Sequence, residues 1–308
     1  MPHQARDQGP SLVPSAPAGD DRGGVTITST HVPTAGVRAA DGTDYRYRDT
    51  GEIGEGALPL VLLQHFRGNL DNWDPALVDA LARSRRVVTV DGKGVGGSTG
   101  TTPRTVEAMA HDAIAFLEAA GLDRVDLLGF SLGSFVAQEI ALIRPDVVRT
   151  LVLASSAPRG ADGMHGWAPK VMSAIGVPRP SPEGYLDVFF GSSGTSRKAG
   201  RDALARMQAR TQDRDTPTTW ATRQAQYDAV CAWGIPDHGQ LRRLTAIDVP
   251  VLVTNGDSDP MILPRYSYLL AGLLPNASLK IYPDAAHGFL FQHHARFAED
   301  VNAFLARA

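Results

Sequence analysis

The chain has 308 residues, of which 43% are hydrophobic and 20% are charged, and its formal net charge is −3. This size is enough for a large buried core in one or two domains, and the small negative charge gives no indication of nucleic acid or an anionic membrane as a partner. A single cysteine, Cys231, excludes an intramolecular disulfide and a cysteine-rich metal site, which suits a reducing compartment.

The first 24 residues are rich in Pro, Gly, Ala, Ser and charged residues, which predicts a disordered tail over residues 1–24. This stretch has no apolar segment of signal-peptide length. The chain also lacks a run of about 18 apolar residues, the minimum for a membrane helix. We therefore expect a cytoplasmic protein with no membrane partner.

From Val25 onward, segments typical of strands and of helices alternate. The expected strands cover residues 25–32, 45–50, 58–66, 85–91, 124–130, 148–156, 249–257 and 277–285. The expected helices cover residues 105–121, 132–145, 266–275 and 294–308. Short buried strands that alternate with helices are typical of a parallel sheet covered on both faces.

One long segment interrupts this alternation. Between residues 157 and 245 the sequence predicts only helical pieces, at residues 163–176, 181–191, 197–211 and 218–233. Because ligands of open α/β sheets bind at the strand ends, an insertion there is expected to cover the site. The predicted organisation is a core of residues 25–156 and 246–308 with a helical cap over residues 157–245.

The sequence "GFSLG" matches the pattern G-x-S-x-G, with Ser131 between Gly129 and Gly133. It follows an expected strand and opens an expected helix, which is the setting of a nucleophile elbow. The glycines suit a sharp turn that leaves no room for side chains. The alternative is that Ser131 only caps the helix.

A nucleophilic serine needs a base, and the base needs an acid that orients it. Asp257 and Asp259 follow one expected strand, and His287 follows the next. All three loops leave the same edge of a parallel sheet as Ser131, so these side chains can meet there. Each residue also has a local interpretation, as a turn aspartate or as a histidine with a local hydrogen bond.

From Val25 to its end, the chain resembles the α/β-hydrolases, and within them the capped, cofactor-independent branch of esterases, enol-lactonases and non-haem haloperoxidases. Four motifs in order carry the resemblance: "VDGKGVGGS", "LLGFSLGS", "NGDSDPMILP" and "YPDAAHGF". The resemblance implies an α/β fold with a mostly parallel eight-stranded sheet, flanked by helices, and a helical cap. It also implies that neither a metal nor an organic cofactor is required.

The resemblance also implies a catalytic triad of Ser131, His287 and Asp259. Asp259 is the acid because it lies three residues after Gly256, and Asp257 is the alternative. The family's usual proline comes four residues after the acid. Here Leu263 holds that place and Pro264 follows.

The family usually has His-Gly-x after its third strand, and the N–H of x helps to form the oxyanion hole. Counted back from Trp73, the family's His and Gly correspond to Gln64 and His65, and Phe66 takes the donor position. The expected hole is then made by the backbone N–H groups of Phe66 and Leu132. His65 is expected to be structural, with its side chain turned away from the site.

The sequence thus predicts a serine hydrolase that cleaves a carboxylic ester or lactone of a small, largely apolar molecule through an acyl-enzyme. A cofactor-free haloperoxidase or perhydrolase with the same triad and a carbon–carbon bond hydrolase are alternative enzymes. A ligand receptor is the alternative outside enzymes, since fold does not fix function. The serine at the elbow argues against the epoxide-hydrolase and haloalkane-dehalogenase branches, which use a carboxylate.

Overall fold

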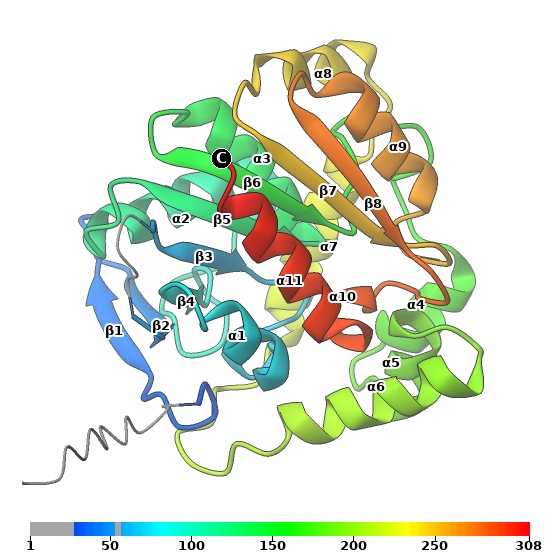
Figure 1. The fold of residues 1–308 in the computed structure, drawn as a ribbon, viewed down its shortest axis with the longest axis horizontal. Helices are drawn as coiled ribbons and strands as arrows, with labels where there is room; N and C mark the ends of the chain where they lie inside the picture. Colours follow the sequence, from blue (N-terminus) through cyan, green and yellow to red (C-terminus); the bar gives the residue numbers. More distant parts are fainter. Residues whose placement is uncertain (1–27, 53–56) are drawn as a thin grey trace, which may run out of the picture.

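The computed structural model describes residues 28–52 and 57–308, so the predicted tail over residues 1–24 lies outside the described residues (Figure 1). The centre of the fold is an eight-stranded sheet in the order β1-β2-β4-β3-β5-β6-β7-β8. β2 pairs antiparallel with β1 and β4, and all other neighbours are parallel. The strands are β1 (Ala35–Arg38), β2 (Asp44–Thr50), β3 (Leu60–Leu63), β4 (Val87–Val90), β5 (Val125–Phe130), β6 (Val148–Ala154), β7 (Val251–Gly256) and β8 (Ala277–Tyr282). The predicted α/β class with a mostly parallel eight-stranded sheet is confirmed.

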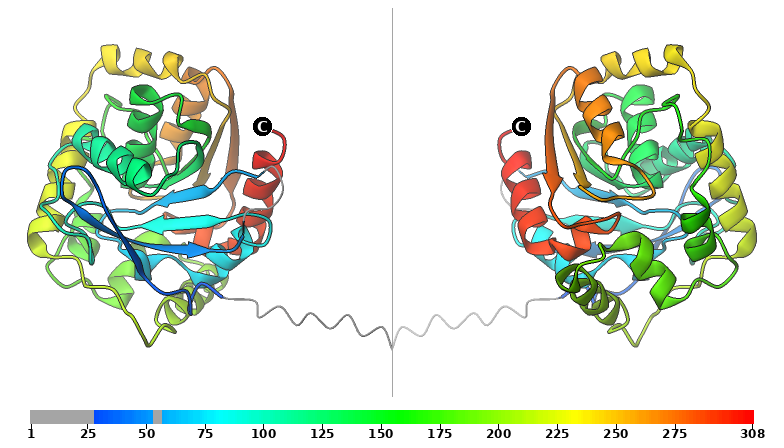
Figure 2. Two further views of the ribbon diagram at one scale, coloured as in Figure 1. Left: turned by 90° about the vertical axis from the view of Figure 1, so that its left-hand side faces the viewer. Right: turned by 90° about the vertical axis from the view of Figure 1, so that its right-hand side faces the viewer.

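Helices cover both faces of this sheet, as the side views show (Figure 2). α1 (Pro75–Leu81) and α11 (His294–Leu305) pack against each other on one face. α2 (Val106–Ala119) and α3 (Leu132–Ile143) pack on the other, and α9 (Pro264–Leu273) runs along β7 and β8. The start of α2 follows the sequence signal: the Thr105 side chain caps the helix by accepting a hydrogen bond from the Ala108 N–H.

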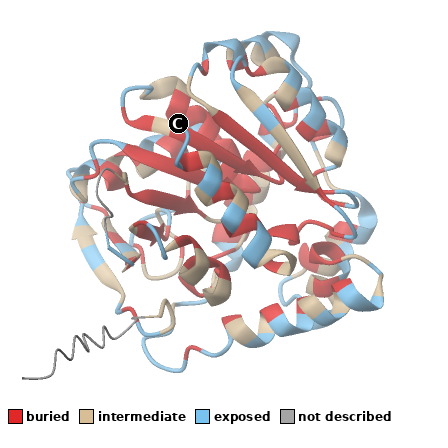
Figure 3. Cartoon of the chain, viewed as in Figure 1, coloured by how far each residue is buried: buried red, intermediate tan, exposed pale blue. Residues whose placement is uncertain are grey.

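The central strands are continuous apolar runs because both of their faces are covered. Every residue of β3, β4, β5 and β7 is buried (Figure 3). Leu63, at the end of β3, pairs with Gly129 of β5. The loops that leave the carboxyl ends of these parallel strands therefore start side by side, where ligands of such sheets bind.

Residues 157–245 are described throughout and contain helices but no strand. The helices are α4 (Pro169–Ile175), α5 (Pro182–Phe189), α6 (Gly194–Met207), α7 (Trp220–Trp233) and α8 (His238–Arg242), and the 3₁₀ helix η2 (Arg243–Ala246) begins within this segment. α5 ends beside the loop that follows β8, because the Gly288 N–H donates to the Phe189 carbonyl at 2.7 Å. Figure 1 shows α4 and α5 near the carboxyl ends of β7 and β8. The action of this segment as a cap stays a prediction.

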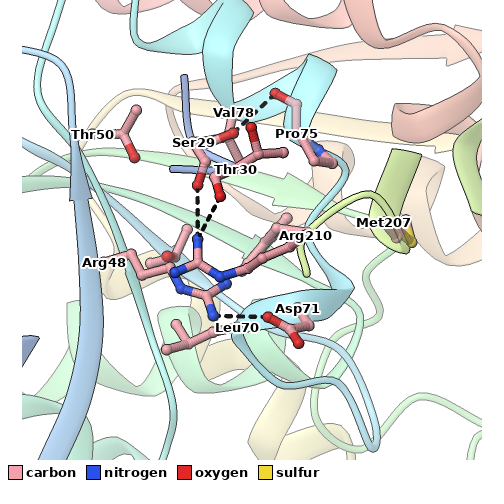
Figure 4. Close-up of a pocket in the computed structure, with 12 residues that line it drawn as sticks. Ser29, Thr30, Arg48, Thr50, Leu70, Asp71, Pro75, Val78, Met207 and Arg210 are labelled. Atoms are coloured by element: carbon pink, nitrogen blue, oxygen red, sulfur yellow. Dashed lines mark hydrogen bonds and ion pairs between the residues drawn. The ribbon is translucent and has the colours of Figure 1, made fainter. Parts of the chain in front are cut away.

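The prediction of a strand at residues 25–32 is wrong for residues 28–32, the part that the structure describes. Residues 28–32 form turns, and the first strand is β1, three residues later. The Arg210 guanidinium donates to the carbonyls of Ser29, Thr30 and Val32 at 3.2, 3.1 and 2.8 Å. An arginine about 180 positions away thus satisfies backbone groups that a strand partner would otherwise take (Figure 4).

Candidate active site

Ser131 lies on a strained turn between β5 and α3. Its φ of 55° and ψ of −119° fall in a region that side chains disfavour. A Cβ atom at Gly129 would lie 2.4 Å from the Gly133 carbonyl oxygen, and one at Gly133 would lie 2.1 Å from the Leu63 oxygen. Only glycine fits at either position, which explains the spacing of the motif. The Ser131 side chain makes no capping hydrogen bond to α3, so it does not act as a helix cap here.

His287 and Asp259 form a buried pair after β8 and β7. The Nδ1 atom of His287 lies 2.8 Å from Oδ2 of Asp259, and both side chains are fully buried. The carboxylate can only accept, so Nδ1 carries the proton and Nε2 keeps its lone pair. Nε2 is buried without a hydrogen-bond partner in the described residues. The His287 ring lies 5.1 Å from that of Phe130, the residue directly before Ser131.

The two candidate acids have different surroundings. Oδ1 of Asp259 accepts hydrogen bonds from the Met261 and Ile262 N–H groups at 2.8 and 3.0 Å, which aims Oδ2 at His287. Pro264 is the first residue of α9, just after this loop. The structure therefore brings Asp259, and not Asp257, to the histidine.

Asp257 instead holds the loop that precedes His287. Its carboxylate accepts from the Ser258 hydroxyl at 2.8 Å and from the N–H groups of Asp284 and Ala285 at 2.9 and 3.1 Å. Burial alone would raise the pKa of Asp257, but these hydrogen bonds outweigh it and lower the pKa. Asp257 is thus an ionised anchor that keeps the histidine loop in place.

The N–H groups of Phe66 and Leu132 donate no hydrogen bond within the described residues. Leu132 is the first residue of α3, where N–H groups have no partner within the helix and carry partial positive charge. Leu132 directly follows Ser131 in the chain. Free N–H groups can hold the negative oxygen of a tetrahedral intermediate where they lie beside the nucleophile. The positions expected from the sequence are therefore available for this role.

The family model of the alpha/beta hydrolase fold matches residues 59–294. The chain belongs to the alpha/beta hydrolase family of enzymes. A solved alpha/beta hydrolase fold protein from Chitinophaga pinensis is 37% identical, with a TM-score of 0.86, and covers 92% of this hydrolase and 100% of that chain. A non-heme chloroperoxidase of Streptomyces lividans is 28% identical over 87% of this chain and 98% of its own. A pimeloyl-[acyl-carrier protein] methyl ester esterase of Klebsiella pneumoniae is 29% identical over 83% of this chain and 96% of the esterase.

His65 does not turn away from the site of this hydrolase, in contrast to the expectation. Its ring packs edge-on against Phe130 and Phe189, each at 5.2 Å, and both of these rings also contact His287. Burial lowers the pKa of His65 to about 3, so the ring is neutral. Its Nδ1 donates to the Phe66 carbonyl at 2.8 Å. His65 therefore supports the loop that carries the expected oxyanion donor.

The site of this hydrolase is closed. Ser131 is 2% exposed and His287 is 0% exposed. The Phe189 ring at the end of α5 lies 5.2 Å from the His287 ring, and backbone hydrogen bonds join the end of α5 to the histidine loop. α5 therefore covers His287 on this side of the site.

A cavity of about 80 Å³ lies beside the elbow, between the sheet, α2 and α3. Its apolar wall includes Leu132, Val136, Met109 and Phe116, and Gln226 of α7 also lines it. Charged residues contribute to the rest of the lining: Asp91, Lys93 and Asp112. The cavity of about 30 Å³ drawn in Figure 4 is lined by none of the predicted site residues. Of the predicted site residues, only Leu132 lines the cavity beside the elbow.

No group of three or more His, Cys, Asp or Glu side chains in residues 28–52 and 57–308 is arranged to hold a metal ion. Over the same ranges, no helix is both long and apolar enough to span a bilayer.

Proposed function

We propose that this hydrolase cleaves a carboxylic ester or lactone of a small, largely apolar molecule through an acyl-enzyme. The observation that carries the proposal is the buried His287–Asp259 pair behind the strained elbow of Ser131. Nε2 of His287 has no hydrogen-bond partner among the described residues, Ser131 included, so the serine–histidine contact is itself part of the proposal. A serine nucleophile, a histidine base and an aspartate that orients the base are the three parts of a serine-hydrolase triad. The cavity beside Leu132, whose lining is mostly apolar, supports a substrate with an apolar portion next to the reacting carbonyl.

The proposed reaction has two halves. In the first, Ser131 Oγ bonds to the carbonyl carbon while its proton moves to Nε2 of His287. The N–H groups of Phe66 and Leu132 stabilise the oxyanion, and Asp259 stabilises the charged imidazole. The carbonyl reforms, and the alcohol leaves with the proton from Nε2. In the second half, water attacks the acyl-enzyme, Nε2 accepts its proton, and the acid is released with Ser131 reprotonated.

We further propose that residues 157–245 act as the cap of this site. The Phe189 ring of α5 covers His287, which supports a role in excluding water and in shaping the pocket. A covered pocket favours small esters and lactones over peptides, which need an open cleft.

A second candidate function uses the same residues. The similarity to the chloroperoxidase of Streptomyces lividans over 87% of this chain favours a perhydrolase, in which peroxide replaces water in the second half. The product is then a peracid that oxidises halide. Bromination that requires both hydrogen peroxide and acetate would support this function, and hydrolysis without bromination would exclude it.

The test of the proposed function is labelling with a fluorophosphonate, followed by a panel of esters and lactones. The wild-type protein should be labelled at one residue and should hydrolyse at least one class of substrate. Ser131→Ala should abolish both, because no other hydroxyl holds the elbow position. Ser134→Ala is the control: this buried hydroxyl, one turn further along α3, lies 2.5 Å from the Ser131 carbonyl oxygen and 2.7 Å from the Ser156 hydroxyl, so its loss perturbs the elbow but leaves the Ser131 hydroxyl in place. Labelling that persists in Ser131→Ala, or is absent from the wild-type protein, would contradict the proposal and favour a ligand receptor.

A further inference from the structure

Arg223 of α7 is a buried arginine without an acidic partner. Four arginines in residues 28–52 and 57–308 are buried: Arg48, Arg85, Arg210 and Arg223. The first three pair with Asp71, Asp126 and Asp213 at 2.7, 3.4 and 2.9 Å. Arg223 is 3% exposed, and within the described residues no carboxylate lies within 4.0 Å of it. A buried charge is normally paired, because its desolvation is expensive.

Aromatic rings surround the Arg223 guanidinium. Its Cζ atom lies 4.7 Å from the ring centre of Tyr227, 4.8 Å from Trp220 and 5.6 Å from Phe66. Such contacts stabilise a cation through the faces of the rings, but they leave its N–H groups unsatisfied. Phe66 also supplies a proposed oxyanion donor, so the cation lies against the loop that would hold the reacting carbonyl.

One edge of this guanidinium has no hydrogen-bond partner among the described residues. Nη1 donates to the Gln224 side chain at 3.1 Å, whereas Nε is buried without a partner in the described residues. Nε and Nη2 form the edge that binds two oxygens at once. In this chain, Arg206 uses that edge on Asp74, and Arg149 uses it on Asp126, in each case at 2.8 and 2.6 Å. Arg223 makes no such pair in residues 28–52 and 57–308.

Arg67 adds a second positive charge at the same place. Its guanidinium donates to the carbonyls of Ile175, Val177 and Pro178, at the end of α4, at 3.3, 2.7 and 3.1 Å. Burial and the charge of Arg223 both lower the pKa of Arg67, so the two cations interact. The Asp228 carboxylate is already bound by Arg104 and by Gln224, which leaves the pair with a net positive charge.

We propose that Arg223 binds a carboxylate at the far end of the substrate, so that the hydrolase acts on small esters or lactones that also carry a free acid group. The inference rests on the proposed function and refines its substrate class. A carboxylate matches the free edge in charge and in its two oxygens, and it neutralises the buried cation. The low exposure of Arg223 strengthens such an ion pair, because a buried charge interacts more strongly than one in water.

The test compares two substrates that differ only by a terminal carboxylate, monomethyl adipate and methyl valerate, at neutral pH. The wild-type protein should have the higher kcat/KM for the adipate ester. Arg223→Met, which keeps an unbranched apolar stem, should lower the adipate-to-valerate ratio of kcat/KM by about 10- to 100-fold, with a loss in kcat as well as a rise in KM. Arg223→Lys should retain part of the ratio. Arg201→Met, at an exposed position on α6, is the matched control and should leave the ratio unchanged.

A ratio that Arg223→Met does not change, or a wild-type preference for methyl valerate, would overturn the inference. If no ester is hydrolysed, the proposed function fails. Binding of adipate then tests separately whether Arg223 holds a carboxylate. Adipate should raise the melting temperature of the wild-type protein but not of Arg223→Met, and equal shifts would refute the site. Because the charge is unpaired, Arg223→Met without ligand should melt no lower than the wild-type protein.

Discussion

Exchange of the triad acid offers a sharp test, because the two neighbouring aspartates have different partners. In Asp259→Asn, the amide oxygen can still accept from the Met261 and Ile262 N–H groups, so the loop should stay folded. The amide N–H groups then face Nδ1 of His287, which carries a proton itself. The ring must change its tautomer, and Nε2 can no longer accept the serine proton.

The size of this effect follows from burial. Asp259 is 1% exposed and His287 is 0% exposed, so loss of the carboxylate leaves the charged imidazole without its partner. Removal of one partner of a buried ion pair costs about 3–5 kcal/mol, which is about 10²- to 10⁴-fold in rate. The unfavourable tautomer adds to this loss, so we expect kcat to fall by about 10⁴-fold.

The assay is steady-state hydrolysis of the best ester from the panel, with circular dichroism to confirm folding. Asp257→Asn is the matched control. It weakens the anchor of the histidine loop, which should lower stability by about 1–2 kcal/mol and kcat by less than about tenfold. A larger loss of kcat in Asp257→Asn than in Asp259→Asn would refute the assignment of the acid.

Three further predictions concern the stability of the folded protein. Gly133→Ala places a Cβ atom 2.1 Å from the Leu63 oxygen and should lower the free energy of unfolding by about 3 kcal/mol or more. Gly272→Ala near the end of α9 meets nothing within 4 Å and should raise it by about 0.5–1 kcal/mol, as denaturant titration would show. Burial and a hydrogen bond with Asp215 raise the pKa of Asp91. The folded protein therefore keeps this proton at a pH where the unfolded chain has lost it, and stability falls as the pH rises above about 4 toward the folded pKa. Asp91→Asn should remove this loss, and an equal loss of melting temperature between about pH 4 and 8 in both proteins would contradict it.

Local signals were sufficient to predict the central strands and the elbow. β3 to β7 are mostly apolar because helices cover both of their faces, and this pattern is visible without any tertiary information. The motif glycines could be predicted because their space is limited by the turn itself and by the adjacent strand end. Asp259 followed from its spacing after Gly256, and the hydrogen bonds within its own loop explain why that spacing aims it at His287.

Other features depend on partners far away in the chain. The β-branched residues before Pro33 resemble a strand, but Arg210 binds their carbonyls and holds them in turns. The ring of His65 faces Phe189 of α5, a contact that no local pattern indicates. Arg223 did carry a weak signal, because Trp220 and Tyr227 lie on its side of α7 at helical spacing. Only the structure shows that, in the described part of the chain, no carboxylate pairs with the Arg223 guanidinium.

The contacts of Arg67 connect substrate recognition with the oxyanion hole. The backbone N–H of Arg67 donates to the Gln226 side chain at 2.7 Å, and its carbonyl accepts from Thr218 at 2.7 Å, so α7 and the segment before it hold both sides of this residue. Its guanidinium holds the end of α4 as well. Phe66 directly precedes Arg67, and the position of its N–H therefore depends on the position of α4 and α7. A carboxylate bound by Arg223 would fix α7 against Phe66 and would place the oxyanion donor at the same time. Binding energy from a remote part of the substrate would then appear in kcat and not only in KM, which is how binding at a distance accelerates a reaction.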